Sequence, residues 1–285
     1  MTEPKLRLST TKIGNFLGCR KRYYWTYERK LVPVIKSRPL QVGSVVHDLA
    51  EKFRLGEITM DTFSHLDEYV HQLFPNNTQQ ESVSIAIEAG KLAQMYIMKY
   101  ENDPYKVISP EMHLELERDE YILYTRLDSM FRGPNERLWR GEIKTTARMD
   151  SAYLSGLKGS LQSGIAYLVM KEVIPEPVFG TVYDLIVKKK EPECHRMPIP
   201  AEKRLLANTE ETIAGVVRDI KRADFYPSMQ CFTYNRECDY YHLCYRYSER
   251  VVEEFYTEYI PFYETKKEEG GIKAEQVYKK LELSK

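Results

Sequence analysis

The chain has 285 residues, enough for one large domain or two small ones with buried cores. Charged residues make up 29% and apolar residues 42%, as in ordinary soluble proteins, and the net charge of zero gives no overall attraction to polyanions. No apolar run approaches the roughly 18 residues of a membrane span, and no signal peptide is visible, so we expect a cytoplasmic protein without a membrane partner.

The N-terminal segment is locally basic, because residues 1–40 contain ten Lys and Arg against two Glu. A helix is predicted from an N-cap at Ser9 or Thr10 through Tyr27, with Cys19 inside it, since apolar residues recur at helical spacing. Basic residues interleaved with aromatics suit single-stranded nucleic acid, although a solvated helix with a Tyr-rich core face accounts for them equally well. The candidate DNA-binding residues are Arg20, Lys21, Arg22 and Tyr23.

The following segments are predicted from local patterns. Residues 31–40, with two prolines, form a connector, and a second helix opens at Gly43 and carries His47. Further helices are predicted over residues 61–74, 80–101, 151–173 and 201–223, with strands in part of 106–117 and over 178–188. Residues 225–247 are predicted to be irregular. Helices therefore precede and follow a small sheet, which indicates an α/β fold.

The central feature is a predicted β-hairpin of residues 121–128 and 138–144 around a turn-rich segment. With a five-residue loop, Asp128 stands opposite Glu142. Side chains alternate along a strand, so Glu142 and Lys144 share a face that Asp128 joins across the ladder. Such a patch can hold a divalent cation and act on phosphate. A solvated charge cluster is the alternative, but the apolar neighbours favour a functional site.

Asp128, followed after fourteen residues by Glu142 and then Lys144, resembles the metal-binding core of the PD-(D/E)XK nuclease superfamily. Gly43-x-x-x-His47 is similar to the helical His motif of the branch containing RecB, AddB and the CRISPR-associated iron–sulfur exonucleases. The resemblance implies a restriction-endonuclease-like mixed β-sheet flanked by helices. It also implies Mg²⁺ or Mn²⁺ bound by His47, Asp128, Glu142 and the Ile143 carbonyl, and a role for Lys144 in activating water and stabilising charge.

The same branch carries a Gln-x-x-x-Tyr motif on the next helix, for which Gln162 and Tyr167 are the catalytic candidates. Their separation is five rather than four residues, which turns the second side chain about 140° away from the first on a helix. Ser163 holds the position that the motif would give to Gln, and an ordinary amphipathic helix accounts for Gln162 as well.

Cysteines form a second constellation, with Cys231, Cys238 and Cys244 close together and Cys19 far upstream. Clustered cysteines in a cytosolic chain favour metal over disulfide. The arrangement resembles that of iron–sulfur members of this branch, which implies a structural [4Fe–4S] cluster that ties the chain ends together. Zinc is the weaker alternative, since the spacing is wider than Cys-x-x-Cys. Cys194 is predicted to be a spare thiol.

Residues 1–248 are predicted to form the nuclease domain with its iron–sulfur segment, and 249–285 a charged, aromatic tail. The tail either packs on its own chain or docks a partner through its apolar residues, which are Phe255, Tyr256, Tyr259, Ile260, Phe262 and Tyr263.

The expected function is metal-dependent hydrolysis of DNA, by an exonuclease acting on ends or single strands in recombination, repair or phage DNA processing. The alternatives are a DNA-binding module with little chemistry and a spacer-acquisition nuclease that needs a recombination or integrase partner.

Overall fold

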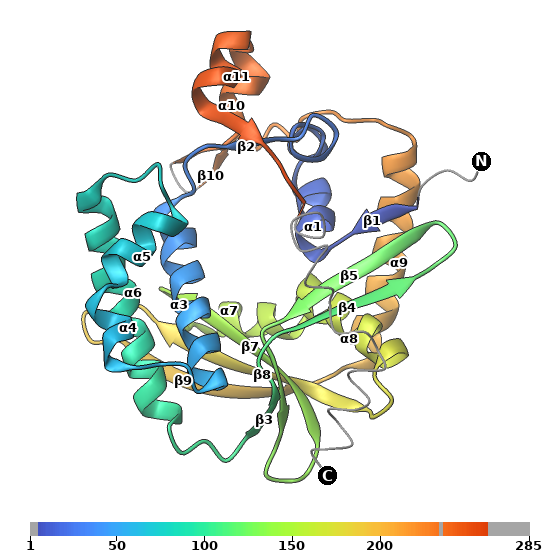
Figure 1. The fold of residues 1–285 in the computed structure, drawn as a ribbon. Helices are drawn as coiled ribbons and strands as arrows, with labels where there is room; N and C mark the ends of the chain where they lie inside the picture. Colours follow the sequence, from blue (N-terminus) through green and yellow to red (C-terminus); the bar gives the residue numbers. More distant parts are fainter. Residues whose placement is uncertain (1–4, 234–235, 262–285) are drawn as a thin grey trace. The chain divides into compact units, whose positions relative to one another are not determined.

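The computed structural model describes residues 5–233 and 236–261, which separate into two compact units (Figure 1). Unit 1 contains residues 5–35, 115–124 and the described part of 207–261, and unit 2 contains residues 36–114 and 125–206. Each unit has its own cluster of buried apolar side chains. No helix in the described part of the chain is long and apolar enough to cross a membrane.

Unit 2 is built on a five-stranded sheet of order β3-β6-β7-β8-β9. These strands are β3 Lys106–Ser109, β6 Ser129–Arg132, β7 Leu138–Thr146, β8 Val178–Val187 and β9 Glu193–Pro200. Strands β7 and β8 are parallel and the other pairs are antiparallel, so the sheet is mixed, as expected. The crossover between the parallel strands contains α7 Ser151–Lys158 and α8 Leu161–Val173.

Helices cover both faces of this sheet (Figure 1). One face packs against α3 Arg38–Leu55, α4 Met60–Ser64, α5 Leu66–Leu73 and α6 Gln79–Tyr100. Ile143 of β7 lies in this cluster, whereas Tyr183 and Leu185 of β8 pack against α7. Glu142 and Lys144 pair with Tyr183 and Leu185, so they face the α7 side, opposite to Ile143.

Helix α3 begins earlier than the sequence predicts. Ser37 is its N-cap residue, and Pro39 lies in the first turn, where the missing N–H removes no intrahelical hydrogen bond. The predicted connector is therefore partly helical, and its first residues form the short strand β2 Leu31–Pro33. The helix ends at Gly56, which adopts the left-handed conformation (φ 75°).

The predicted hairpin is correct in register but shorter than expected. Arg132 pairs with Leu138 and Ser129 with Gly141, which is the predicted alignment. Residues before Asp128 instead form β5 Tyr121–Leu127, which belongs to a separate sheet of order β1-β5-β4 with β1 Leu6–Leu8 and β4 Met112–Glu117. The chain thus changes sheets at Asp128.

The predicted N-terminal helix, which lies in unit 1, is interrupted. Ser9 caps α1 Thr10–Gly18, but Cys19 is extended (φ −162°, ψ 113°), and the chain continues as α2 Arg20–Tyr23 and the π-helical turn η1 Tyr24–Glu28. The expectation that Cys19 lies inside a helix was therefore wrong. Its extended backbone ends one helix and begins the next, and its thiol accepts a hydrogen bond from the Ser228 N–H.

The C-terminal part of unit 1 contains several short elements in the region predicted to be irregular. After α9 Lys203–Lys221 come β10 Phe232–Thr233, β11 Arg236–Glu237, α10 Tyr241–Tyr245, α11 Glu249–Phe255 and β12 Tyr256–Glu258. Strand β12 pairs with β2, and Tyr256 is buried beside Tyr240. The described part of the tail therefore packs on its own chain, while Phe262 and Tyr263 lie outside the described residues.

Candidate active site

Asp128 comes directly before β6, at the end of that strand beyond which β7 continues. Its Oδ2 accepts a hydrogen bond from the backbone N–H of Ile143 at 2.9 Å. A carboxylate thus takes the place that another strand residue would hold in the ladder. The N–H and C=O of one strand residue point to the same side, so the Ile143 carbonyl also points toward this open edge.

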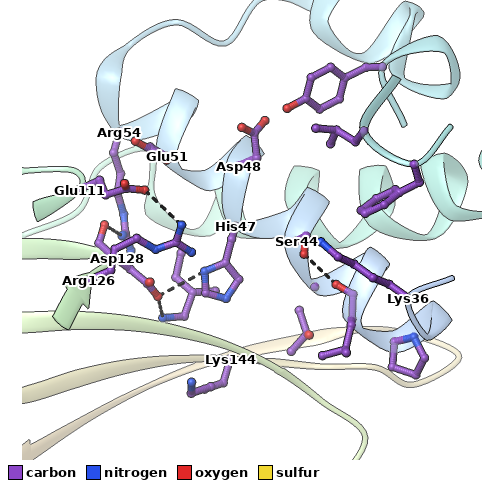
Figure 2. Close-up of a pocket in the computed structure, with 18 of the residues that line it drawn as sticks. Lys36, Ser44, His47, Asp48, Glu51, Arg54, Glu111, Arg126, Asp128 and Lys144 are labelled. Atoms are coloured by element: carbon purple, nitrogen blue, oxygen red, sulfur yellow. Dashed lines mark hydrogen bonds and ion pairs between the residues drawn. The ribbon is translucent and has the colours of Figure 1, made fainter. Parts of the chain in front are cut away.

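Helix α3 brings His47 to the same edge, with Nδ1 3.3 Å from Asp128 Oδ2 (Figure 2). Burial alone would raise the pKa of Asp128. The interactions with His47, the Ile143 N–H and Arg140 outweigh burial and hold that pKa below its ordinary value. Asp128 is therefore an ionised carboxylate at neutral pH.

Glu142 lies on the face of β7 that packs on the α7 side, opposite to Ile143, and 1% of its surface is exposed. Its Oε1 is 2.5 Å from Lys144 Nζ and accepts a hydrogen bond from Gln162 Nε2 at 2.8 Å. Gln162 Oε1 in turn accepts from Lys144 Nζ at 2.7 Å. Burial lowers the pKa of Lys144, Asp128 opposes this shift and Arg140 adds to it. The expected convergence of Asp128, Glu142 and Lys144 on one face is thus corrected to an arrangement around the edge of β7.

Arg140 was not predicted as a site residue. Its side chain is fully buried, and Nη2 donates a hydrogen bond to Glu142 Oε2. Nη1 lies 3.4 Å from Ser163 Oγ and 3.5 Å from Thr181 Oγ1. The signal was present in the sequence, because Arg140 stands two residues before Glu142 and so shares its face of the strand.

Gln162 and Tyr167, the two candidates on α8, contact different residues. Gln162 contacts Glu142 and Lys144, whereas Tyr167 is buried and its hydroxyl shares a 2.8 Å hydrogen bond with Thr181 Oγ1. Ser163, at the motif position, shares a 2.6 Å hydrogen bond with the Tyr183 hydroxyl. The five-residue step therefore separates the two side chains, and Gln162 is the one beside the charged pair.

His47, Asp128, Ile143 and Lys144 line a cavity of about 660 Å³. The distance between His47 Nδ1 and Asp128 Oδ2 is close to the roughly 3 Å that separates neighbouring ligands of an octahedral ion at about 2.1 Å. Within residues 5–233 and 236–261, no three His, Cys, Asp or Glu side chains are grouped closely enough to hold a metal ion, and Glu142 is paired with Arg140 and Lys144. The donor chemistry of imidazole, carboxylates and a carbonyl fits Mg²⁺ or Mn²⁺.

Unit 1 contains the four predicted cluster cysteines, but within the described residues no three of them are grouped closely enough to hold a metal ion. The Cys238 N–H donates to the Cys231 carbonyl at 2.7 Å. Burial raises the pKa of the Cys244 thiol, and interactions with Cys19 and Cys231 raise it further. Cys194 is separate, since it is buried on β9 with its thiol 3.6 Å from the Tyr100 hydroxyl.

The candidate DNA-binding residues have partners within unit 1. Arg20 forms a 2.5 Å ion pair with Asp219, and Lys21 Nζ lies 4.2 Å from the centre of the Tyr24 ring. Arg22 interacts electrostatically with the Cys238 thiol. Burial raises the pKa of that thiol, and the positive charge of Arg22 opposes the shift. The expectation for Tyr23 is corrected, because its fully buried ring packs on Phe16 and Phe225 and cannot stack on a base. Those contacts are at 5.2 and 5.7 Å between ring centres.

Comparisons with known proteins identify the fold and the family of the chain. A crystal structure of a candidate exonuclease from Eubacterium rectale has a similar fold, with a TM-score of 0.55 and 14% identity over 85% of this chain and 88% of that chain. The crystal structure of SSO0001 matches with a TM-score of 0.35 and 14% identity over 75% of this chain and 78% of that chain. No curated protein matches significantly. Residues 7–245 match the family model of the PD-(D/E)XK nuclease superfamily, and the chain therefore belongs to that superfamily.

Proposed function

We propose that this protein is a Mg²⁺- or Mn²⁺-dependent deoxyribonuclease, an exonuclease that acts on DNA ends or single strands. The observation that carries the proposal is the arrangement around the end of β6. His47 and Asp128 face the cavity there, and Lys144 lines the same cavity from the α7 face of β7, where Glu142 and Gln162 contact it. The nucleases of this superfamily use divalent metals. The exonuclease described for the Eubacterium rectale structure supports the exonuclease mode, and recombination, repair or phage DNA processing is the proposed context.

His47, Asp128, Glu142 and the Ile143 carbonyl are the proposed metal ligands. A divalent cation there would supply a bound water of lowered pKa and offset negative charge on the phosphate. Asp128 is the ligand best prepared by the fold, because the Ile143 N–H fixes its orientation and its lowered pKa keeps it ionised.

Lys144 is the proposed catalytic cation. Glu142 and Gln162 fix its ammonium group, so it is oriented before substrate arrives. From this position it donates a hydrogen bond to the attacking water or to the charge that develops on the phosphate oxygens. Its lowered pKa makes the release of a proton easier than for an exposed lysine. Gln162 acts through Lys144 and Glu142 as a positioning residue, and Tyr167 supports the adjoining strand through Thr181.

We also propose that Cys19, Cys231, Cys238 and Cys244 ligate a structural [4Fe–4S] cluster. Four thiolates are what such a cluster needs. Burial would raise the pKa of Cys19, but hydrogen bonds from the Ser228, Arg22 and Lys21 backbone lower it, which favours the thiolate. Protein purified without oxygen is expected to be brown and to contain iron and sulfide. A colourless protein loaded with zinc would contradict the cluster.

The nuclease is tested with end-labelled single-stranded and duplex DNA in Mg²⁺, Mn²⁺ or EDTA. We expect metal-dependent products that shorten from one end, lost in Lys144→Ala and retained in Lys171→Ala, which removes an exposed lysine of α8. DNA binding without cleavage under every metal would contradict the proposal and favour a binding module or a partner-dependent enzyme.

A further inference from the structure

The cavity at the candidate active site has two chemically different ends. Figure 2 shows Lys36 and Ser44 at one end and Glu51 and Glu111 at the other, with His47 between them. Burial raises the pKa of Glu51 to about 7, and the neighbouring Glu111 carboxyl raises it as well. Arg54 and Arg126 line the same end, so it carries groups of both signs. The lysine end therefore attracts a phosphate chain, whereas the other end has charges of both signs.

The lysine end also has an apolar wall. Leu40 of α3 is 63% exposed and Leu73 of α5 is 42% exposed, and both line the cavity. Phe74 lies beside them with its ring centre 5.8 Å from Lys36 Nζ. Two large aliphatic side chains open to solvent inside a charged cavity indicate contact with a flat or apolar part of a ligand.

Cations flank this wall. Lys36 is exposed, and Lys188, at the end of β8, is 3.9 Å from its acidic neighbour Glu88. Both line the cavity together with Lys144. The lysine end thus combines an apolar surface, which a base can contact, with positive charges, which can bind a phosphate.

We propose that Leu40, Leu73, Lys36 and Lys188 form a subsite for one unpaired nucleotide next to the scissile phosphate, with its base on the leucines and its phosphate near the lysines. In a duplex the bases are stacked and paired, so only an unpaired nucleotide can place a base against these side chains. The subsite selects single-stranded nucleic acid ends. This inference rests on the proposed nuclease function and adds a specificity site to it.

The test compares Leu40→Ser/Leu73→Ser and Lys36→Gln with the wild-type protein. Both leucines are exposed, so the fold tolerates the changes. Met98→Ser is the matched control, since Met98 is 79% exposed on α6 and does not line the cavity. The probes are a fluorescent oligo(dT) strand and a blunt DNA hairpin, with binding measured in EDTA and cleavage in Mn²⁺.

The leucine pair is expected to weaken oligo(dT) binding about tenfold or more and to raise KM for the single strand while duplex values stay unchanged. Lys36→Gln is expected to weaken binding with a smaller dependence on salt. Because binding is measured without metal, these losses support the subsite even if no DNA is cleaved, which would overturn only the nuclease. Equal binding by the wild type, the leucine pair and Met98→Ser would overturn the subsite, as would wild-type protein that binds no oligo(dT).

Discussion

At the scale of single residues, Gln162 uses both ends of its amide within the site. Its Nε2 donates to Glu142 and its Oε1 accepts from Lys144, so one side chain fixes the relative position of an anion and a cation. A neutral amide does this without adding charge to a site where Arg140 already lies against Glu142. Its contribution is therefore orientation of the charged pair rather than charge.

Replacing Gln162 should impair chemistry more than binding. Gln162→Leu is expected to lower kcat by about 10–100-fold with little change in KM, because Lys144 loses the partner that orients it. Ser163→Ala is the control at the next position, where the hydroxyl contacts Tyr183, and it is expected to lower Tm without this loss of kcat. Equal kcat for Gln162→Leu and the wild type would contradict the positioning role.

The charged end of the cavity predicts a pH-dependent stability. Glu51 faces Glu111, Asp48, Tyr69 and Arg126, and its pKa of about 7 in the folded protein exceeds its ordinary value of 4.5. The folded state then binds more protons than the unfolded state between these values, so this group stabilises the fold as pH falls from about 7 to 4.5. Glu51→Gln is expected to raise Tm at pH 8, with the gain shrinking toward pH 5. A gain independent of pH would exclude ionisation of Glu51 as its cause.

At the scale of elements, α3 contains a glycine that packing does not require. A Cβ on Gly43 would meet Thr145 Oγ1 at 3.5 Å, an ordinary contact, and the residue has no positive φ. Glycine inside a helix costs roughly 1 kcal/mol relative to alanine. Gly43 and Thr145 both line the cavity, so the space above this glycine belongs to the site.

Gly43→Ala should therefore separate stability from activity. It is expected to stabilise the protein by about 1 kcal/mol through helix propensity and to reduce cleavage, because a methyl group enters the cavity. Gly215→Ala in α9, where a Cβ would meet only Arg218 Nη2 at 3.8 Å, is expected to stabilise the protein without loss of cleavage. Urea unfolding and initial rates measure the two effects, and unchanged rates for Gly43→Ala would contradict substrate approach at this glycine.

The sequence predicted elements whose signal is local and missed those set by distant contacts. The β6–β7 register and the mixed sheet were predicted correctly. Strand β9 was missed because Pro198 and Pro200 argue against a strand, yet β9 is an edge strand, where prolines are tolerated. The change of sheets at Asp128 and the break at Cys19 depend on partners far along the chain, which periodicity cannot show.

The candidate site was predicted by residue type more accurately than by geometry. His47 and Asp128 meet at the edge of β7, whereas Glu142 and Lys144 lie on the face of β7 that packs on the α7 side. Arg140 was overlooked because a lone Arg in a strand is normally assigned to the surface, whereas here Glu142 compensates its charge in the interior. Spacing thus selected the candidate residues, and the tertiary structure determines how they are arranged.

At the scale of the whole molecule, the proposed iron–sulfur cluster lies in one compact unit and the candidate active site in the other. Calorimetry is expected to resolve two transitions, since each unit has its own core. Cys231→Ser should lower the transition of unit 1, because loss of a ligand undoes the proposed cluster. Cys194→Ser, the matched change on β9, should lower only the transition of unit 2. Identical traces for Cys231→Ser and the wild type would contradict the cluster.

The buried ion pair between Arg140 and Glu142 has a consequence for folding in the absence of a divalent ion. The Arg140 guanidinium forms an ion pair with Glu142 inside the protein. The Glu142 carboxylate, which we propose as a metal ligand, is therefore paired with a cation of the chain itself, and we expect unit 2 to fold without a divalent ion. If Mg²⁺ or Mn²⁺ is the cofactor, as we propose, protein made without these ions is expected to be folded but inactive and to regain activity when the ion is added.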